Sequence, residues 1–482
     1  MSGDIAANAI EVINLSSSEM PETTLLIFPP WLDHLSEYPP LGICQLGAVL
    51  EQEGLPVSLL DLGLWKEEEW KARLIPKMNE VKPTLVGISA QTSMIMMGLK
   101  IAEFIKTTHP EIKILLGGPH PTARPNEALK KSFVDYVIRG EGEIPLLELA
   151  LKKDITAIKG LSYKKDGKII HNPLPPLIDN LNELPLPARH LLDLKQYAWF
   201  PEISLMSSRG CPFPCYYCFG KVFGKKFRGR SAEQVVKEME YLNKKYGYTK
   251  FYFYDDVFTL NKNRVLEFCN LLFERGHKFE WRCLSRIDTL DDGNFERLKM
   301  MRKAGCIKIQ FGIETGDPDL MKKIKSITQE QARRVVQAAK DAGIETKCYF
   351  MIGHPWDTKE SVMNTIRFAK EVGSDLSLFS IVTPFPETKL WEMAKEMGII
   401  IEEEDRDWST FYVNSENMDD HIMRTYTLST RDLIRFYKKG WRELYLKTMV
   451  DMFKNPAKLL KIIKTRGIIT VARSFYRKII VP

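Results

Sequence analysis

Short apolar runs alternate with longer stretches of helical spacing over the first third of the chain. The runs are rich in Leu, Ile and Val, and the stretches between them repeat apolar residues every three or four positions, as amphipathic helices do. Strands are expected at 24–30, 57–62, 84–90, 112–118 and 136–140, with helices at 41–53, 67–79, 96–107, 125–131 and 144–152. Strands that alternate with helices form a parallel sheet covered on both faces. We therefore expect a doubly wound, Rossmann-like α/β domain over residues 23–155.

A second series of the same kind follows an irregular segment. Residues 156–201 are rich in proline and have no period, so we expect a linker there. Strands are then expected at 203–208, 251–256, 279–286, 307–316, 345–353 and 375–385, with helices at 232–246, 262–275, 292–304, 329–342 and 359–371. Six strand–helix repeats are too few for a (β/α)8 barrel and predict a partial (β/α)6 barrel over 202–400. Beyond it, a mostly α-helical region at 401–482 is expected to cap the barrel mouth, and residues 1–22 are expected to be a flexible arm.

Composition is that of an ordinary folded protein. Hydrophobic residues make up 44% of the chain and charged residues 27%, which excludes a disordered chain and a polytopic membrane protein. Residues 1–20 lack the basic and apolar pattern of a secretory signal, and no apolar run is long enough to span a bilayer. We therefore expect a cytoplasmic protein with reduced cysteines.

The positive charge is concentrated near the C-terminus. The net charge is +7, but residues 421–482 hold fifteen Lys and Arg against three Asp and Glu, so the rest of the chain is acidic. This distribution argues against a globally basic nucleic-acid-binding protein. Between Lys454 and Lys478, eight basic residues are mixed with aliphatic and aromatic ones. Two interpretations stay open: a basic amphipathic tail on the inner face of an anionic membrane, or a final helix packed on the domain with its charges in water.

Three of the eight cysteines crowd into one short loop. Cys211, Cys215 and Cys218 follow the expected strand at 203–208, whereas the other five stand singly among apolar neighbours, as core residues do. A closed zinc site needs four ligands, and no nearby His or Cys completes that set. Thiolates otherwise favour an iron–sulfur cluster, and three ligands leave one iron of a four-iron cube open to bind a further molecule. The motif therefore indicates a catalytic iron–sulfur site.

The spacing CxxxCxxC after the first strand of a βα barrel, with Tyr217 before the last cysteine, resembles the radical S-adenosylmethionine (SAM) superfamily. The resemblance covers residues 202–396 and implies that the three cysteines hold a [4Fe-4S] cluster whose open iron binds SAM. It also implies which residues surround SAM: Tyr217 near the adenine, Asp255 and Asp256 near the methionine amino group, Arg286 at the carboxylate, and Glu314 along the adenosine. For the four charged residues, an ion pair at a strand end is the alternative.

The loops after the expected N-terminal strands combine small residues with hydrogen-bonding ones. They include Ser89, Thr92, Gly117, Gly118, His120 and Glu141. Loops of this composition at the carboxyl ends of parallel strands either form a backbone cradle for a large ligand or serve only as tight turns between strand and helix.

An α/β domain directly before such a barrel, with GGPHPT at 117–122 and RGEGE at 139–143, resembles the cobalamin-binding domain of B12-dependent radical enzymes. The resemblance implies that the six loop residues contact cobalamin, His120 through the corrin or the nucleotide. Because the chain lacks the Asp-x-His-x-x-Gly motif whose His ligates cobalt in many relatives, we expect base-off cobalamin without a protein His ligand. Methylthiotransferases carry three further cysteines in their N-terminal domain, whereas residues 1–200 here contain only Cys44, which excludes that class.

Together the resemblances imply an anaerobic, cobalamin-dependent radical SAM methyltransferase. In such an enzyme a 5′-deoxyadenosyl radical activates an unactivated substrate carbon, which then receives a methyl group from methylcobalamin. Two alternatives stay open: an anaerobic oxidative cyclase of the magnesium-protoporphyrin monomethyl ester type, and a non-catalytic corrinoid-binding regulator. An external electron donor of the flavodoxin or ferredoxin type is implied. The substrate is left open among small molecules, lipids and peptides, and no nucleic-acid partner is expected.

Overall fold

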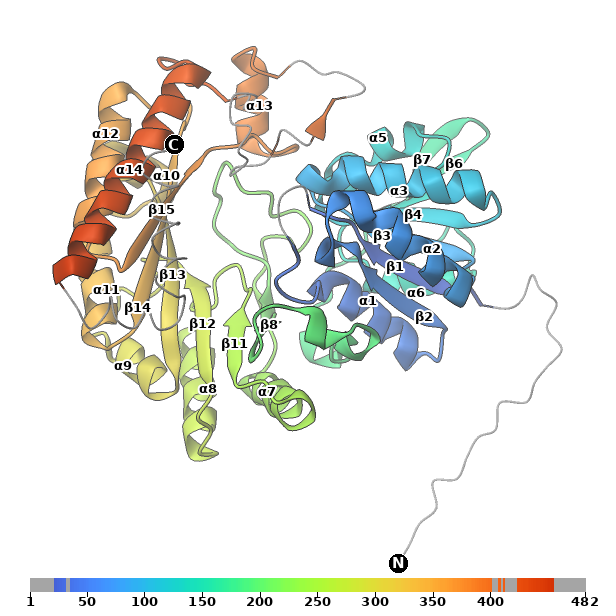
Figure 1. Cartoon of the computed structure of the whole chain (residues 1–482), viewed down its shortest axis with the longest axis horizontal. Helices are drawn as coiled ribbons and strands as arrows, with labels where there is room; N and C mark the ends of the chain where they lie inside the picture. The colour runs from blue at the N-terminus through green and yellow to red at the C-terminus, as the bar shows by residue number, and fades with distance from the viewer. Residues whose placement is uncertain (1–20, 32–34, 401–405, 409–410, 412–422, 455–482) are drawn as a thin grey trace, which may run out of the picture.

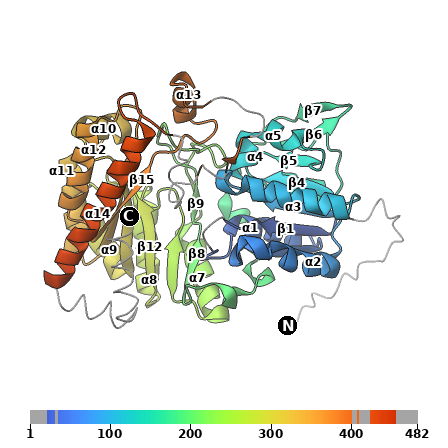
Figure 2. The same ribbon diagram turned by 45° about the horizontal axis from the view of Figure 1, so that its top comes forward.

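Two α/β lobes lie side by side and are followed by a long helix. The structure is a computed structural model that describes residues 21–31, 35–400, 406–408, 411 and 423–454. In Figure 1 the blue and cyan N-terminal sheet lies to the right of the green-to-orange sheet, and Figure 2 shows the same separation after a turn about the horizontal axis. The two expected α/β units are therefore built around separate sheets.

The N-terminal sheet has seven strands in the order β2-β1-β3-β4-β5-β6-β7. They are β1 (Thr24–Phe28), β2 (Val57–Asp61), β3 (Leu85–Ser89), β4 (Lys113–Gly117), β5 (Tyr136–Ile138), β6 (Leu161–Lys165) and β7 (Lys168–His171). The first five pair in parallel, and the strand order reverses between β1 and β3. Doubly wound sheets bind their ligands at such a reversal. The doubly wound prediction is confirmed.

Helices cover both faces of this sheet. They are α1 (Leu41–Gln52), α2 (Trp70–Val81), α3 (Ile95–Thr108), α4 (Pro119–Ala123), α5 (Pro125–Lys130) and α6 (Glu143–Ala150). Successive strand residues point to opposite faces, so Leu25 and Ile27 join the buried core with α2 and α3, whereas Leu26 joins the core with α1 and α6. Because both faces are covered, the strands appear in the sequence as continuous hydrophobic runs.

The sheet extends beyond the boundary expected at residue 155. β6 pairs antiparallel with both β5 and β7, so the chain up to His171 belongs to the N-terminal sheet and not to a linker. Asp166 and Gly167 form the turn with φ of 50° and 74°, as a two-residue hairpin turn requires. The Asp-Gly signal is visible in the sequence, but the lysines around it obscure the alternation of the two strands.

The second sheet has six parallel strands in sequential order. They are β8 (Glu202–Leu205), β11 (Lys250–Phe253), β12 (Glu280–Ser285), β13 (Cys306–Glu314), β14 (Glu345–Ile352) and β15 (Leu376–Ile381). The connecting helices are α7 (Ala232–Tyr246), α8 (Lys262–Glu274), α9 (Glu296–Lys303), α10 (Pro318–Lys325), α11 (Gln329–Asp341) and α12 (Lys359–Glu371). β9 (Ser208–Arg209) and β10 (Arg228–Gly229) form a separate two-stranded sheet. The partial (β/α)6 barrel is confirmed.

Local sequence signals set the ends of the barrel helices. The Ser231 side chain accepts a hydrogen bond from the Gln234 N–H at the start of α7, and Gly247, with φ 80°, ends that helix. Thr328 and Gln331 form a capping box at the start of α11. These caps explain why the helical periods in the sequence locate the barrel helices to within a few residues.

The last described helix covers the outside of the barrel, which differs from the expected cap over its mouth. α14 (Thr430–Lys454) packs against β15 and α12, and Figure 1 shows it in red beside α12. An added Cβ on Gly440 would lie only 3.0 Å from the Phe379 ring, on the helix-covered face of β15. The apolar outer face of β15 needs a cover, because α13 (Lys389–Glu396) is short. α14 provides it.

Two further expectations fall on parts of the chain without a description. Residues 1–20 of the arm expected at 1–22, and nearly all of the basic tail, at 455–482, are outside the described residues. Among the helices that are described, none is both long and apolar enough to cross a membrane.

A segment of the N-terminal domain contacts the inner face of the barrel across β8, β11 and β12. The Tyr38 hydroxyl hydrogen-bonds to Glu202 on β8, and Arg282 on β12 donates to the Tyr38 oxygen at 2.8 Å. Arg282 also forms an ion pair with Glu202 at 2.8 Å. The first barrel strand is therefore joined to the N-terminal domain by a phenol, a carboxylate and a guanidinium.

Candidate active site between the two sheets

A cavity of about 1150 Å³ lies between the carboxyl ends of the two sheets. Its wall contains residues that follow β1, β3, β4 and β5 of the N-terminal sheet and residues that follow β8, β11 and β12 of the barrel. Doubly wound sheets and βα barrels both place their ligands at the carboxyl ends of the strands. The two lobes therefore share one candidate site.

The three clustered cysteines all line this cavity, on the loop between β9 and β10. Cys211, Cys215 and Cys218 are free thiols, and Cys218 is exposed to solvent. Gly210, just before the first cysteine, has φ 82°, and a Cβ there would lie 2.2 Å from the Lys226 carbonyl oxygen. Only glycine fits the start of this loop.

The cysteine loop has the donor chemistry of a cluster site. Burial raises the pKa of the Cys211 thiol. Cys218 is exposed as a residue, but desolvation of its sulfur, together with the neighbouring Cys215, raises the pKa of its thiol as well. These thiols therefore stay protonated until a metal displaces their protons. Within the described ranges, no three His, Cys, Asp or Glu side chains already stand in metal-binding geometry. The cysteine loop therefore suits an iron–sulfur cluster because it brings three soft sulfur ligands together on one loop that lines the cavity.

Four of the five residues expected around SAM lie on the wall near the cysteines: Tyr217, Asp256, Arg286 and Glu314. The Arg286 guanidinium is 3.8 Å from the Cys215 sulfur and pairs with Asp288 at 2.8 Å. Asp288 already occupies Nε and Nη2 of this guanidinium, and Nη2 also donates to the Lys325 carbonyl oxygen. Nη1 is therefore the nitrogen that faces the cysteine loop and can donate to a ligand carboxylate.

Glu314 is held in an unusual backbone conformation at the end of β13. Its φ is 72°, and the register to β14 shifts between Gly312 and Glu314. The Glu314 carboxylate pairs with Lys325 at 3.0 Å, and both side chains line the cavity although they are almost completely buried. A non-glycine residue at positive φ is strained, and such strain persists where the surroundings fix the residue and clusters at functional sites.

Asp255, the fifth residue, does not line the cavity. It is buried, and it accepts hydrogen bonds from the Ser207 N–H at 2.6 Å and from the hydroxyls of Ser207 and Ser208. Both carboxylate oxygens therefore hold the segment that leads into the cysteine loop. A contact of Asp255 with the methionine amino group stays a prediction, while the neighbouring Asp256 faces the cavity.

The adjacent aspartates should respond differently to substitution. Asp255→Asn is expected to destabilise the protein by about 1–3 kcal/mol, because it leaves buried donors without their acceptor. Asp256→Asn is expected to change stability by less than about 0.5 kcal/mol, as substitutions away from buried networks do, but to weaken SAM binding to the cluster-loaded protein. Thermal unfolding and equilibrium SAM binding measure the two effects. Equal losses of stability in both variants would contradict the distinction.

Four of the six residues expected at cobalamin lie on the N-terminal wall: Ser89, Gly117, Gly118 and Glu141. Gly118 has φ 96° and ψ −171°, and an added Cβ would lie 2.9 Å from the Ala90 carbonyl oxygen. That backbone conformation is almost restricted to glycine. Because glycine has no side chain, the backbone of the loop after β4 lies directly at the cavity. A loop that binds a large ligand through its backbone needs this arrangement.

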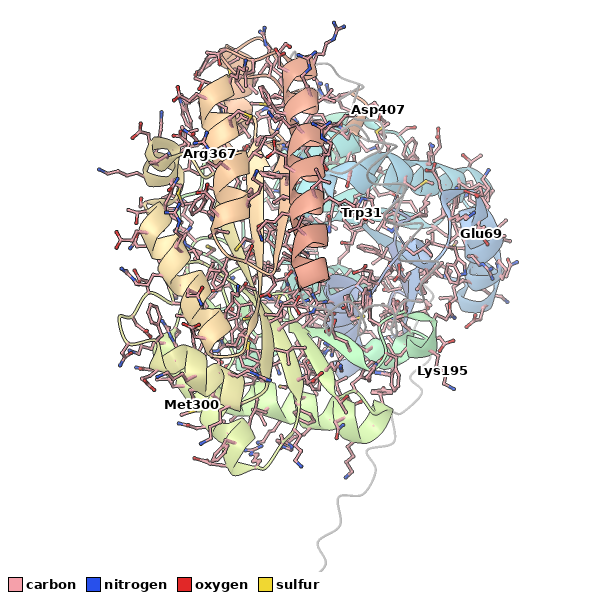
Figure 3. The ribbon with its side chains drawn as sticks, turned by 60° about the vertical axis from the view of Figure 1, so that its left-hand side comes forward. Trp31, Glu69, Lys195, Met300, Arg367 and Asp407 are labelled. Carbon is pink, nitrogen blue, oxygen red and sulfur yellow. The ribbon has the colours of Figure 1, made fainter. Side chains whose placement is uncertain are left out.

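Thr92 and His120 lie behind this wall. His120 is 1% exposed, its Nδ1 is 3.3 Å from the Thr92 hydroxyl oxygen, and its ring packs on Trp408 with centres 4.8 Å apart. Trp408 directly follows Asp407, which is labelled in Figure 3. Burial, assisted by Arg124, lowers the pKa of His120 to about 3, so the ring is neutral. A direct contact of these two residues with cobalamin stays a prediction; the structure places them as support for the loop.

Substituting His120 should change how stability depends on pH. The pKa of His120 is about 3 in the folded protein and about 6.5 in an unfolded chain. The neutral ring therefore stabilises the fold above that upper value and loses this contribution as the pH falls. Relative to His120→Asn, the wild type should lose about 1.4 kcal/mol per pH unit below about 6.5. Denaturant unfolding at several pH values tests this.

A matched variant separates titration from packing at this position. Thr92→Val removes the hydrogen-bond partner of His120 without changing a titratable group. Its stability difference from the wild type should therefore stay constant over the same pH range. A constant difference for His120→Asn as well would show that His120 is not held neutral.

Several cavity residues were not identified from the sequence: Gln91, Arg209, Gln310, Lys325 and Tyr349. For two of them the sequence holds a signal, because they stand next to residues that were identified. Arg209 closely precedes the cysteine motif, and Gln91 follows the polar end of β3. Gln310 and Tyr349 point into the barrel because alternate strand residues do, and the Tyr349 hydroxyl donates to Gln310 at 2.6 Å. Lys325 lies on α10, a helix that the periodicity did not reveal.

Comparison with known proteins assigns the two lobes to two families. Residues 34–150 match the B12 binding domain, and residues 205–369 match the Radical SAM superfamily. A protein of Pyrococcus horikoshii described as an uncharacterized methyltransferase is 33% identical over 94% of this chain and 98% of its own length. The anaerobic magnesium-protoporphyrin IX monomethyl ester cyclase of Rubrivivax gelatinosus is 27% identical over 81% of this chain and 73% of its own.

A solved structure shares the arrangement of both lobes. The radical S-adenosylmethionine methyltransferase TsrM from Kitasatospora setae, with cobalamin and a [4Fe-4S] cluster bound, superposes with a TM-score of 0.67 at 21% identity. The match covers 80% of this chain and 76% of the other. Both the cysteine motif and the Gly-rich loops lie inside the matched segments. The chain therefore belongs to the cobalamin-dependent radical SAM enzymes.

Proposed function

We propose that this enzyme is a methyltransferase that methylates an unactivated carbon. The observation that carries the proposal is the shared cavity: the three cysteines and the Gly-rich loops of the B12 binding domain line the same wall. When bound, the [4Fe-4S] cluster and SAM supply a 5′-deoxyadenosyl radical, and cobalamin supplies the methyl group. The protein itself contributes ligands, orientation and exclusion of water.

The barrel residues hold the cluster and SAM in this proposal. Cys211, Cys215 and Cys218 are the iron ligands, and Arg286 binds the SAM carboxylate through its guanidinium. Tyr217 and Glu314 flank the nucleoside, and Asp256 receives the amino group. Support comes from their common position on the wall and from the 3.8 Å separation of Arg286 from the Cys215 sulfur.

Cobalamin occupies the N-terminal wall in this proposal, with Ser89, Gly117, Gly118 and Glu141 beside it. Among the described residues, no histidine lines the cavity. The proposal accordingly has a cobalamin without a protein His ligand, in the base-off form that the resemblance implies. His34 lies outside the described residues.

The substrate then binds on the barrel side of the cavity, next to Leu284, Met351 and Tyr254. The cavity as a whole exposes more apolar than polar surface, and Gln310 contributes an amide whose oxygen is fixed by Tyr349. A small molecule, lipid or peptide with an apolar segment and one hydrogen-bonding group suits these surfaces. Cys218 is exposed, so an external electron donor of the flavodoxin or ferredoxin type can approach the cluster from solvent. Membrane contact through the tail stays a prediction.

An anaerobic labelling experiment tests the proposal. The reconstituted protein is incubated with reductant, SAM labelled in its methyl group and cell extract, and labelled products are identified. Label in a new carbon–methyl bond, with release of 5′-deoxyadenosine, is expected. The similarity to the cyclase of Rubrivivax gelatinosus makes cyclisation the second candidate. An oxygenated, unlabelled product would favour it, and absence of SAM cleavage would remove both.

A further inference from the structure

The B12 binding domain holds both ends of the cysteine loop with one carboxylate. Glu141 accepts a hydrogen bond from Arg209 at 2.8 Å and from Arg228 at 2.9 Å. Arg209 and Arg228 are directly opposite partners in the β9–β10 pair, which are the residues on either side of the loop that carries the cysteines. Glu141 thus closes the base of the loop from the other domain.

A second carboxylate of the same segment fixes the loop further. Glu143 accepts from Arg209 at 2.6 Å, so the two terminal nitrogens of Arg209 are bound by different glutamates. All four side chains are buried, and their two negative charges balance their two positive charges. Removing one member of such a buried group leaves an uncompensated charge, and the geometry of the remaining members is then no longer fixed.

The contacts continue into the loop itself. Arg228 donates to the carbonyl oxygens of Phe223 and Ile178 at 2.7 Å each, and the Ile178 N–H donates to Glu141 at 2.8 Å. The Arg209 guanidinium lies over the Phe223 ring, 5.1 Å from its centre. Phe223 is five residues after Cys218 and five before Arg228, so the cysteine loop is also held between its last cysteine and its base.

The acidic segment faces the cobalamin side of the cavity at the same time. Gly140, Glu141, Gly142 and Glu143 all line the cavity, between β5 and α6. Glu141 and Glu143 cannot shift without moving Arg209, and Arg209 directly precedes the residues that begin the cysteine loop. A displacement on either side is therefore transmitted through two ion pairs and not through solvent.

We propose that Glu141 and Glu143 are positioning residues that couple cobalamin binding to the cluster site. The inference rests on the proposed function for the presence of both cofactors. Cluster loading orders the cysteine loop, the arginines order the segment from Gly140 to Glu143, and cobalamin then meets an ordered wall. Coupling of this kind is reciprocal, so each cofactor raises the affinity for the other by the same factor.

Cobalamin affinity with and without the cluster measures the coupling. Hydroxocobalamin is titrated into full-length protein before and after anaerobic reconstitution with iron and sulfide. Cluster-loaded wild type is expected to bind it more tightly by about fivefold or more, the usual lower range for coupled sites. In Glu141→Gln and Glu143→Gln the ratio should fall towards one. Hydroxocobalamin should also alter the electron paramagnetic resonance signal of the reduced cluster in the wild type, but not in these variants.

Glu202→Gln is the matched control, because it removes another carboxylate that joins the two domains, at the amino end of β8, and its partners are Tyr38 and Arg282 rather than residues of the cysteine loop. Glu202→Gln should keep the wild-type ratio. If Glu141→Gln does not fold, as its melting curve would show, the milder Glu143→Gln decides. An unchanged ratio in a folded Glu143→Gln, or the same loss in Glu202→Gln, overturns the coupling. A wild type that binds neither cluster nor hydroxocobalamin overturns the proposed function instead.

Discussion

Cys215→Ala, reconstituted without oxygen, is expected to carry no [4Fe-4S] cluster and to release no 5′-deoxyadenosine from SAM. Two thiols cannot hold a cluster that already has one ligand fewer than usual. Cleavage should fall to the uncatalysed background, a loss of at least about 10⁶-fold on the usual scale of enzymatic rate enhancement. Iron and sulfide analysis, visible absorbance and chromatography of the nucleoside products measure the outcome.

Cys348→Ala is the control for this substitution. Cys348 is a buried free thiol on β14, part of the barrel core and away from the cavity wall. Its replacement should retain the cluster and change the free energy of unfolding by about 1 kcal/mol, as a typical core substitution does. Iron-loaded, active Cys215→Ala protein would refute the assignment of the cysteine loop, and so would a wild type that binds zinc at these thiols and no iron.

Gly118→Ala is expected to weaken cobalamin binding by about ten- to 100-fold while cluster assembly remains. The new Cβ would lie 2.9 Å from the Ala90 carbonyl oxygen, in a backbone conformation that costs a non-glycine residue about 1–3 kcal/mol. The loop after β4 can relieve this strain only by moving away from β3, which deforms the wall proposed for cobalamin. Titration of hydroxocobalamin into cluster-loaded protein measures the affinity.

Gly54→Ala separates the effect at Gly118 from a general penalty for positive φ. Gly54 has φ 70°, no atom lies within 4 Å of a Cβ added there, and it does not line the cavity. Both variants should lose some stability, but only Gly118→Ala should lose cobalamin. Unchanged affinity in Gly118→Ala would place cobalamin away from this loop.

The sequence predicts the elements that depend on local pattern. The strands at the centre of the N-terminal sheet are buried on two faces, and the barrel strands alternate buried with half-buried residues, so both kinds of run are recognisable. The capping residues of α7 and α11 locate the helices between the barrel strands. The β6–β7 hairpin escapes prediction because it lies at the sheet edge, where exposed lysines are tolerated and the hydrophobic contrast is weak. α14 is recognisable as a helix, but nothing in its sequence shows which strand it covers.

The site residues that the sequence identifies are those whose role depends on neighbours in the chain, and the ones it misses depend on residues far away in the sequence. The cysteines lie next to one another in sequence, so their chemistry is visible at once. The roles of Glu141 and His120 depend on partners far along the chain: Arg209 and Arg228 for the first, Trp408 for the second. Two adjacent side chains can also point in different directions: Asp255 hydrogen-bonds to Ser207, whereas Asp256 lines the cavity. A pattern of residue types identifies such loops but not the direction of each side chain.

The phenol of Tyr38 has a consequence for engineering. A six-stranded barrel is not a closed ring, and here the neighbouring domain contacts the inner face of its first strands through Glu202 and Arg282. Exchanging the whole N-terminal half for that of a relative would therefore remove this contact with the barrel along with the B12 binding domain. Functional chimeras should require grafts that carry this tyrosine, or its equivalent, together with the acidic segment at 140–143.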